Sequence, residues 1–309
     1  MKKYFILLLC ISARLISIGQ IPDRPDIDFA IQGKFAKAVK AIDKTIDKDP
    51  VNSQYHIAKA DYQLQLKEYE GAVKTLSHAM ELMPDSFELF NMMGVLSESF
   101  KMNEMAIMYF GLAYSKAAKN TDKAAVLVNR GGTKLKMRNF QGSYDDLIIA
   151  RRLDSTNIDV LNNLAAVSDK VGHENETLGY IMAILEIDSN YVPAYINLGF
   201  KYQALNRHKE AINFFDRAVK LAPFEALAYS NRAYSKLKTE DIEGAKKDIN
   251  KSIELFSTNS YAYKIRALIH VENANKKKAC EDLHTATQLG YRKQFGEEVD
   301  ELIKTHCQE

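Results

Sequence analysis

The chain repeats itself at an interval of 34 residues, and this period restricts its fold more than any other feature. One column of small residues reads Ala60, Gly94, Gly131, Ala165, Gly199, Ala233 and Ala267. A second column, twelve positions further on, reads Ala72, Ala106, Ser143, Thr177, Ala211, Ala245 and Ala279. The period is kept except between Gly94 and Gly131, where the interval is 37 and the extra residues are expected in the turn at 119–122. Uninterrupted repetition of this kind is typical of a solenoid, whose repeats pack only on their neighbours.

The segment from Val192 to Glu225 shows what one unit contains. Residues of its first half share one side of a 3.6-residue helix: Tyr195, Leu198, Gly199 and Tyr202. Residues of its second half do the same: Ala211, Phe215 and Ala218. A polar break at Asn206 and Arg207 separates the halves, and Pro223 ends the unit. Each unit is therefore predicted to be two amphipathic helices joined by a turn.

The pattern Y-x2-L-G-x2-Y, followed by A-x3-F and then A and P, resembles the tetratricopeptide repeat, with Tyr195 in place of the usual leading Trp. The resemblance covers nearly all of the chain after the first twenty residues. It implies an all-α, right-handed α-solenoid of about eight helix-turn-helix units. The resemblance implies that the chain is a protein-interaction scaffold. Together with its first twenty residues, it indicates an exported bacterial member of the family.

The register of the pattern divides the chain into a signal peptide, a repeat array and a cap. Residues 1–19 are the signal, and 20–52 form a degenerate first unit in which Asp26 replaces a small residue. The repeats that follow are 53–86, 87–123, 124–157, 158–191, 192–225, 226–259 and 260–293. Residues 294–309 are expected to form a C-terminal capping helix with one apolar side: Phe295, Val299, Leu302 and Ile303.

The first nineteen residues are typical of a secretory signal. A basic start at Lys2 and Lys3 precedes an apolar run from Tyr4 to Ser12, and small residues allow cleavage after Gly19. The protein is therefore expected to be exported, and periplasmic or envelope-associated. Two alternatives are an uncleaved N-terminal anchor and a lipoprotein modified at Cys10, although Leu9 occupies the position where a lipoprotein signal needs a small residue.

Removal of the signal leaves two cysteines, Cys280 and Cys307, which are 27 residues apart. The first lies early in the second helix of the last repeat, and the other follows the closing helix. Their ends meet if these helices are antiparallel, so a disulfide is predicted in an oxidising compartment. In the alternative, Cys280 is a buried small apolar residue and Cys307 a free thiol.

The sequence offers little support for nucleic-acid binding, catalysis or metal binding. The formal charge of +2 falls close to zero once the signal is removed, so no nucleic-acid partner is expected. No nucleotide-binding, zinc-protease or nucleophile-elbow motif occurs, and the seven histidines are scattered. We therefore expect no catalytic residue, metal or cofactor, and the mature chain has no apolar run long enough to span a membrane.

Four asparagines form a regular column at 34-residue spacing: Asn129, Asn163, Asn197 and Asn231. An amide carries a donor and an acceptor, so such a ladder can pair with the backbone of an extended peptide, with Phe200 and Tyr234 on the same face for apolar contact. Ala58 and Met92 occupy this column before the four asparagines, and Ile265 occupies it after them. Binding is therefore expected within residues 124–259. The alternative is that the asparagines bond only within the array.

The predicted function is that of a non-enzymatic scaffold that holds a protein or peptide segment in the concave groove of the array. A second hypothesis is a structural subunit of an envelope or secretion assembly that acts through its convex face or by oligomerisation. A carbohydrate-binding or peptidoglycan-binding role is less well supported, because such a groove would carry more exposed aromatic platforms.

Overall fold

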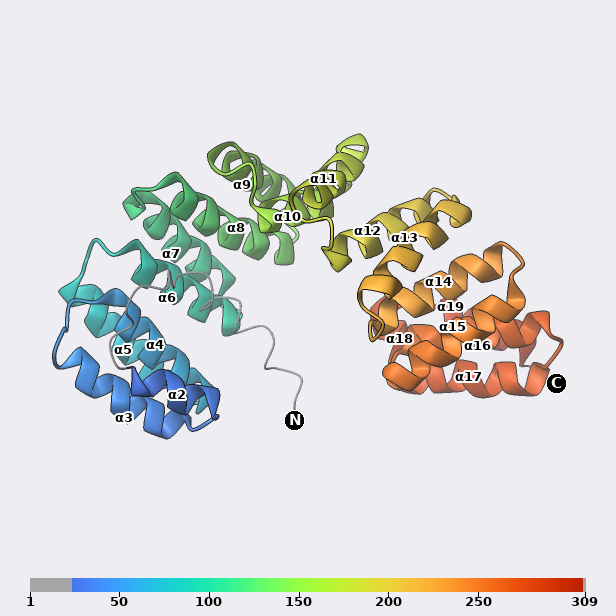
Figure 1. Cartoon of the computed structure of the whole chain (residues 1–309), viewed down its shortest axis with the longest axis horizontal. Coiled ribbons are helices and arrows are strands. Elements are labelled where there is room, and N and C mark those ends of the chain that lie inside the picture. Colours follow the sequence, from blue (N-terminus) through green and yellow to red (C-terminus); the bar gives the residue numbers. More distant parts are fainter. Residues whose placement is uncertain (1–23, 308–309) are drawn as a thin grey trace. The chain divides into compact units, whose positions relative to one another are not determined.

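The computed structural model describes residues 24–307, which are helical throughout with no strand among them. The predicted signal peptide at residues 1–19 lies outside the described residues. Helices follow one another in antiparallel pairs (Figure 1), which confirms the predicted all-α solenoid of helix-turn-helix units. None of the described helices is both long enough and apolar enough to cross a bilayer.

The chain forms two compact units, residues 1–153 and residues 154–309. The described helices of unit 1 are α2 (Pro25–Ile31), α3 (Phe35–Ile46), α4 (Ser53–Gln65), α5 (Tyr69–Leu82), α6 (Phe87–Ser99), α7 (Asn103–Lys116), α8 (Asn120–Lys136) and α9 (Phe140–Leu153). Those of unit 2 are α10 (Ile158–Ser168), α11 (Glu174–Ile187), α12 (Val192–Ala204), α13 (His208–Leu221), α14 (Ala226–Lys238), α15 (Ile242–Leu255), α16 (Ser260–Glu272), α17 (Lys276–Gln288), α18 (Tyr291–Phe295) and α19 (Glu298–His306).

Two details differ from the expectation. The extra residues between Gly94 and Gly131 lengthen α8, which has 17 residues where α6 has 13, instead of enlarging the preceding turn. The cap is two short helices and not one, because Gly296 adopts φ 92° between α18 and α19. Tyr291 and Val299, one on each short helix, are both buried against the last hairpin.

The turn inside each described hairpin contains one residue in the left-handed region, and these residues recur in one column: Gly33, Lys67, Lys101, Arg138, Gly172, Asn206, Glu240 and Ala274. The following amide closes the helix, as where Arg207 N–H donates to the Tyr202 carbonyl at 2.9 Å. This is the Schellman arrangement, which satisfies carbonyls at a helix C-terminus. Residues other than glycine adopt this left-handed conformation because the two flanking helices hold the turn in place.

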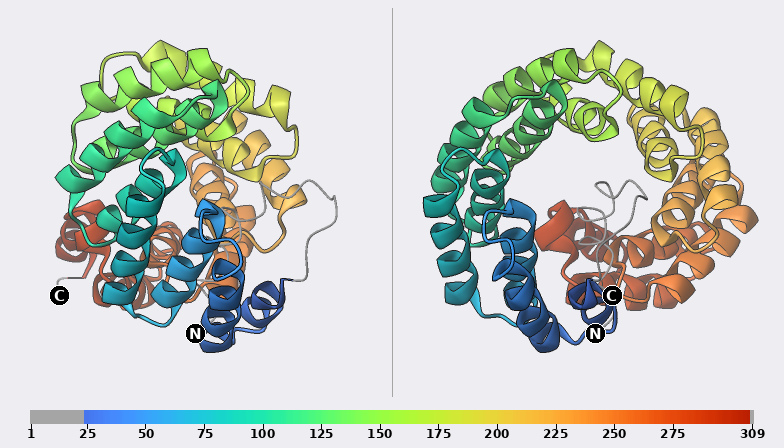
Figure 2. Two further views of the ribbon diagram at one scale, coloured as in Figure 1. Left: turned by 90° about the vertical axis from the view of Figure 1, so that its left-hand side faces the viewer. Right: turned by 60° about the vertical axis from the view of Figure 1, so that its left-hand side comes forward.

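Each hairpin contributes one helix to each of two layers (Figure 2). In unit 2 the first helices contact one another, α12 with α14 and α14 with α16, more extensively than the second helices do among the described residues. In unit 1, α6 lies in the same way between α4 and α8. The layer of first helices is therefore the more closely spaced, and we call it the inner layer of its unit. The layer of second helices is the outer layer.

Candidate functional site

The inner layer of unit 2 presents one stripe of side chains on each of three helices, and all of them except Asn231 are partly or fully accessible. On α12 the stripe consists of Pro193, Asn197, Phe200 and Ala204, at spacings of four, three and four. On α10 it consists of Asp159, Asn163, Ala166 and Lys170. On α14 it consists of Leu227, Asn231, Tyr234 and Lys238. We call these twelve positions the exposed stripe. They face away from the outer layer because the opposite side of each helix is buried in its own hairpin.

Two of the four predicted asparagines have free amides. Asn163 and Asn197 are partly exposed, and their side chains make no hydrogen bond within the described part of the chain. Both are one helical turn from an accessible residue of the same stripe, Ala166 and Phe200 respectively. An amide that is accessible and not engaged internally can pair with an N–H and a C=O of a bound chain.

The other two asparagines are engaged within the array, so the predicted ladder of four is not uniform. Asn231 is 2% exposed and its Nδ2 donates to the Leu227 carbonyl at 2.8 Å. Gln203 of the neighbouring helix contacts the same part of α14, since Gln203 Nε2 donates to the main-chain carbonyl of Asn231 and to Ser235 Oγ, both at 2.8 Å. Asn129 belongs to unit 1, where its Nδ2 donates to Asn91 Oδ1 at 3.0 Å.

Polar contacts between repeats hold the helices of the stripe in place. Lys201 of α12 donates to both carboxylate oxygens of Asp169, which follows α10, at 2.8 and 2.7 Å. Asn162 of α10 donates to the Tyr191 hydroxyl at 2.9 Å. Burial alone would raise the pKa of Asp169, but the hydrogen bonds from Lys201 and Thr177 lower it below its ordinary value. Asn163 and Asn197 thus lie on helices that these polar contacts link.

Phe200 and Tyr234 lie where the sequence predicts apolar contacts. Phe200 is 42% exposed, and its ring packs edge-on against Phe215 at 6.0 Å between centroids. Tyr234 is half-buried, with the His208 ring 5.7 Å away. The Lys238 and Lys264 ammonium groups lie 5.6 and 5.5 Å from the centre of the Tyr234 ring. The partly exposed tyrosine therefore lies beside two cationic groups.

The stripe ends at α16, where the cap covers it. Tyr261 of α16 packs against Phe295 at 5.7 Å, and the Lys264 ammonium donates to Glu298 at 2.7 Å. Burial alone would raise the pKa of Glu298, but hydrogen bonds from Lys264 and Tyr291 lower it. Sequence reasoning did not single out this cluster, because its members come from α16, α18 and α19.

Three hairpins contain a buried Arg-Asp pair that sequence reasoning also missed. Arg130 pairs with Asp146, Arg232 with Asp248 and Arg266 with Asp282, each through two hydrogen bonds of 2.6 to 2.9 Å. A constant separation of 16 residues was the available signal. These pairs join the first helix to the second, so they belong to the scaffold and leave the exposed stripe free.

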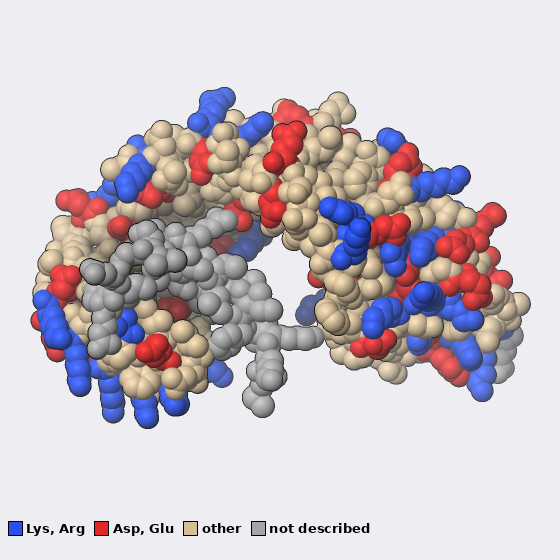
Figure 3. Space-filling model, viewed as in Figure 1, with Lys and Arg blue, Asp and Glu red and all other residues tan. Residues whose placement is uncertain are grey.

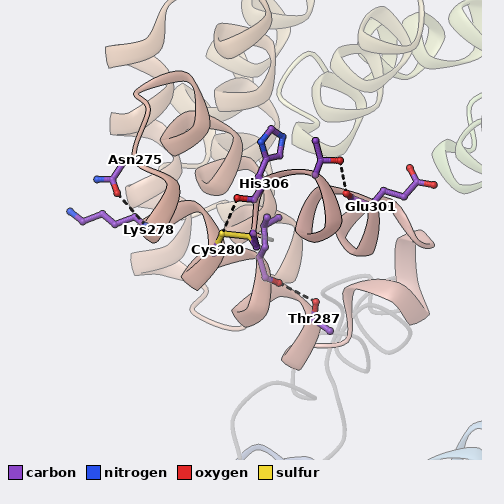
Figure 4. The surroundings of a disulfide bond; sticks show 9 residues. Asn275, Lys278, Cys280, Thr287, Glu301 and His306 are labelled. Carbon is purple, nitrogen blue, oxygen red and sulfur yellow. Dashed lines mark hydrogen bonds between the residues drawn. A yellow bond between two sulfur atoms is a disulfide. The ribbon is translucent and has the colours of Figure 1, made fainter. Parts of the chain in front are cut away.

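The predicted cysteines lie together at the end of the chain (Figure 4). Cys280, in α17, is joined to Cys307 in a disulfide with a Cα–Cα distance of 5.6 Å. Cys280 Sγ also lies 3.7 Å from the His306 carbonyl. Formation of this bond in the cell stays a prediction that depends on the compartment.

No group of three or more His, Cys, Asp or Glu side chains within residues 24–307 is arranged to hold a metal ion. Acidic and basic side chains are interspersed over much of the face shown in Figure 3, and basic ones gather along its lower left edge.

These helix pairs, with an accessible inner layer, define an α-helical repeat protein. Models of the tetratricopeptide repeat match residues 28–82 and residues 192–224. The chain is a tetratricopeptide repeat protein, as its 34-residue pattern predicts. Proteins of this family are typically non-catalytic scaffolds for protein partners.

Similar proteins support the family assignment. A TPR repeat-containing protein of Methanocaldococcus jannaschii is 23% identical over 263 residues, which cover 80% of this chain and 46% of that protein. A TPR repeat-containing thioredoxin of Arabidopsis thaliana is 32% identical over 29% of this chain and 24% of its own. The chain spans less than half the length of these curated relatives.

Solved structures show the same fold. A tetratricopeptide repeat protein of Parabacteroides merdae aligns with a TM-score of 0.63 at 19% identity, covering 82% of this chain and 98% of that one. The APC/C hetero-tetramer Cut9-Hcn1 aligns with a TM-score of 0.66 at 14% identity, covering 89% and 53%. These identities are low, so the likeness concerns the fold.

Proposed function

We propose that the chain is a non-enzymatic scaffold that binds an extended polypeptide segment along the exposed stripe of unit 2. The observation that carries the proposal is the pair of free amides at Asn163 and Asn197, in the same column of consecutive repeats. Helices about 10 Å apart match about three residues of extended chain at about 3.3 Å each. Two such amides can therefore hold backbone groups that are about one repeat apart.

The neighbouring side chains suit this role. Phe200 and Leu227 are 42% and 46% exposed, and each offers apolar contact beside an asparagine column. Amide pairing reads the backbone of a ligand without regard to its side chains, whereas apolar contact adds affinity. Binding is thus assigned to α10, α12 and α14.

The test is a double variant, Asn163→Ala with Asn197→Ala, measured against a partner captured from the exported fraction with the full chain. Affinity is expected to fall by about 1 kcal/mol for each lost backbone pair, with little change in melting temperature. The control is Asn213→Ala with Asn250→Ala, two exposed asparagines of the outer layer. Unchanged affinity in the first variant places the partner elsewhere, and lost stability with unchanged affinity assigns the asparagines to the scaffold.

Export to the periplasm or envelope is part of the same proposal. It rests on the basic start, the apolar run and the small residues that precede Gln20. The mass of the mature protein, recovered from its native compartment, is expected to correspond to a chain that begins at Gln20. A chain that retains Met1 would contradict cleavage after Gly19.

A second candidate function is a structural role exerted through the outer layer. Four exposed apolar side chains follow one side of α7 and its start, at spacings of three, three and four: Met102, Met105, Met108 and Leu112. Their exposed fractions range from 39% to 53%, and methionine surfaces adapt to varied partners. The substitution pair Met105→Glu with Met108→Glu is expected to abolish self-association, as measured by light scattering, if this role holds. A monomer in the unsubstituted protein would exclude self-association.

A further inference from the structure

The α14 end of the exposed stripe carries an excess of positive charge next to apolar surface. Lys238 makes no ion pair within residues 24–307, and its ammonium lies 5.6 Å from the centre of the Tyr234 ring. Lys264 lies on the same ring but is 4% exposed and already paired with Glu298. Two ammonium groups thus surround Tyr234, and Glu298 pairs with only one of them.

The neighbouring histidine does not balance this positive charge. His208, whose ring lies beside Tyr234, has its pKa lowered by burial and by the charge of Lys238, and an imidazole supplies no negative charge in either protonation state. The same lysine contributes to the low pKa of Glu298, which shows that its field reaches both groups. The local charge near Tyr234 is therefore positive.

Apolar side chains lie within the same stripe. Leu227 begins the stripe on α14, and Phe200 lies at the position of α12 that corresponds to Tyr234. An extended ligand that pairs with Asn163 and Asn197 places its next segment over α14, towards Tyr234 and Lys238. At that point it meets an aromatic ring and a free ammonium together.

We propose that this end of the stripe selects peptides in which an acidic residue adjoins an aromatic or aliphatic one. The acidic side chain contacts Lys238, and the apolar side chain packs on Tyr234 and Leu227. This inference rests on the proposed peptide-binding function and specifies the ligand class. Because an exposed ion pair is weak, the acidic residue is expected to improve affinity about threefold to fivefold over its amide analogue. The advantage should shrink as salt is added.

The test is selection of ten-residue random peptides on the full chain, followed by affinity measurement by fluorescence anisotropy. Bound peptides are expected to be enriched in Asp or Glu next to an apolar residue. Replacing that acid by its amide should weaken binding to the unsubstituted protein by about threefold to fivefold, and should have little effect on binding to Lys238→Gln. Lys238→Glu should reverse the enrichment towards Lys and Arg.

The matched control is Lys220→Gln, which makes the same change of charge on the outer-layer helix α13. It should retain the acidic preference. Binders without acidic enrichment, or a preference unchanged in Lys238→Gln, would overturn the inference while leaving the scaffold function intact. Recovery of no binding peptide at all would overturn both.

Discussion

The backbone of Gly199 lies so close to the ring of Phe215 that a Cβ atom at this position would stand 2.5 Å from Cε1 and from Cζ. Gly94 has the same relationship to Phe110, with a distance of 2.6 Å. Both phenylalanines are completely buried, so neither can yield without opening its hairpin. The small-residue column therefore fixes how closely the two helices of a hairpin approach.

Replacing Gly199 by Leu should destabilise the protein by about 1 to 3 kcal/mol, because the core cannot take up the added volume. Thermal or denaturant unfolding measures the loss. The control is Gly179→Ala on α11, where a Cβ would meet nothing within 4 Å and where better helix propensity should be neutral or stabilising. Unchanged melting of Gly199→Leu would contradict the helix register.

Loss of the disulfide should lower stability. The bond closes a 27-residue segment, for which the chain-entropy model gives about 3 to 4 kcal/mol. Cys280→Ser with Cys307→Ser should melt at a lower temperature than the oxidised protein and should be insensitive to reductant. Mass spectrometry of unreduced protein from its native compartment tests the bond itself, and two free thiols there would refute it.

At the Arg232–Asp248 pair, removing one partner should cost more stability than replacing both partners by apolar residues. Asp248 is 3% exposed and accepts from Arg232 and also from Lys236 at 2.8 Å. Asp248→Ala removes the buried partner of both cations, and Arg232 keeps only its second partner Asp216 at 2.7 Å, so the change should cost about 3 kcal/mol. The hairpin of α12 and α13 has Leu198 and Phe214 in the same two columns.

Arg232→Leu with Asp248→Phe introduces the same apolar pair, and it should recover part of the loss in a double-mutant cycle, while Lys236 and Asp216 lose a partner. Denaturant unfolding of the two single variants and the double variant gives the coupling free energy. Purely additive losses would show that the pair does not act as a unit.

Asp61 predicts a pH dependence. Burial raises the pKa of this carboxyl from 3.8 to about 6. The folded protein thus binds a proton that the unfolded chain has already released between these values, so stability falls as pH rises through this window. Asp61→Asn should therefore raise the melting temperature at pH 7.5 and have little effect at pH 4. An equal effect at both pH values would contradict the assignment.

The sequence predicted the hairpins well because each repeat packs mainly on its neighbours, so a single period records most of the contacts. It also contained the Arg-Asp pairs, since Arg130, Arg232 and Arg266 occupy the column of Leu198 with Asp always at the same separation. The cap was predicted as one helix because the apolar spacing from Phe295 to Val299 continues across Gly296 and masks the break.

The state of the asparagine ladder could not be predicted in the same way. All four residues share one column, but whether an amide is free depends on which acceptors lie within its reach. The Asn129 amide donates to Asn91 on a neighbouring helix and the Asn231 amide donates to the Leu227 carbonyl of its own helix, whereas the amides of Asn163 and Asn197 make no hydrogen bond among the described residues. The column alone does not record these acceptors.

The disulfide near the C-terminal end determines the end of the array at which unfolding begins. Repeat arrays lose structure from their ends, because an end repeat has one neighbour and an internal repeat has two. The bond from Cys280 to Cys307 ties α17 to the residue after α19, so the cap helices α18 and α19 cannot detach from α17 while the bond is intact. Native-state hydrogen exchange should therefore progress from α2 towards the C-terminus in oxidised protein, and from both ends once the bond is reduced.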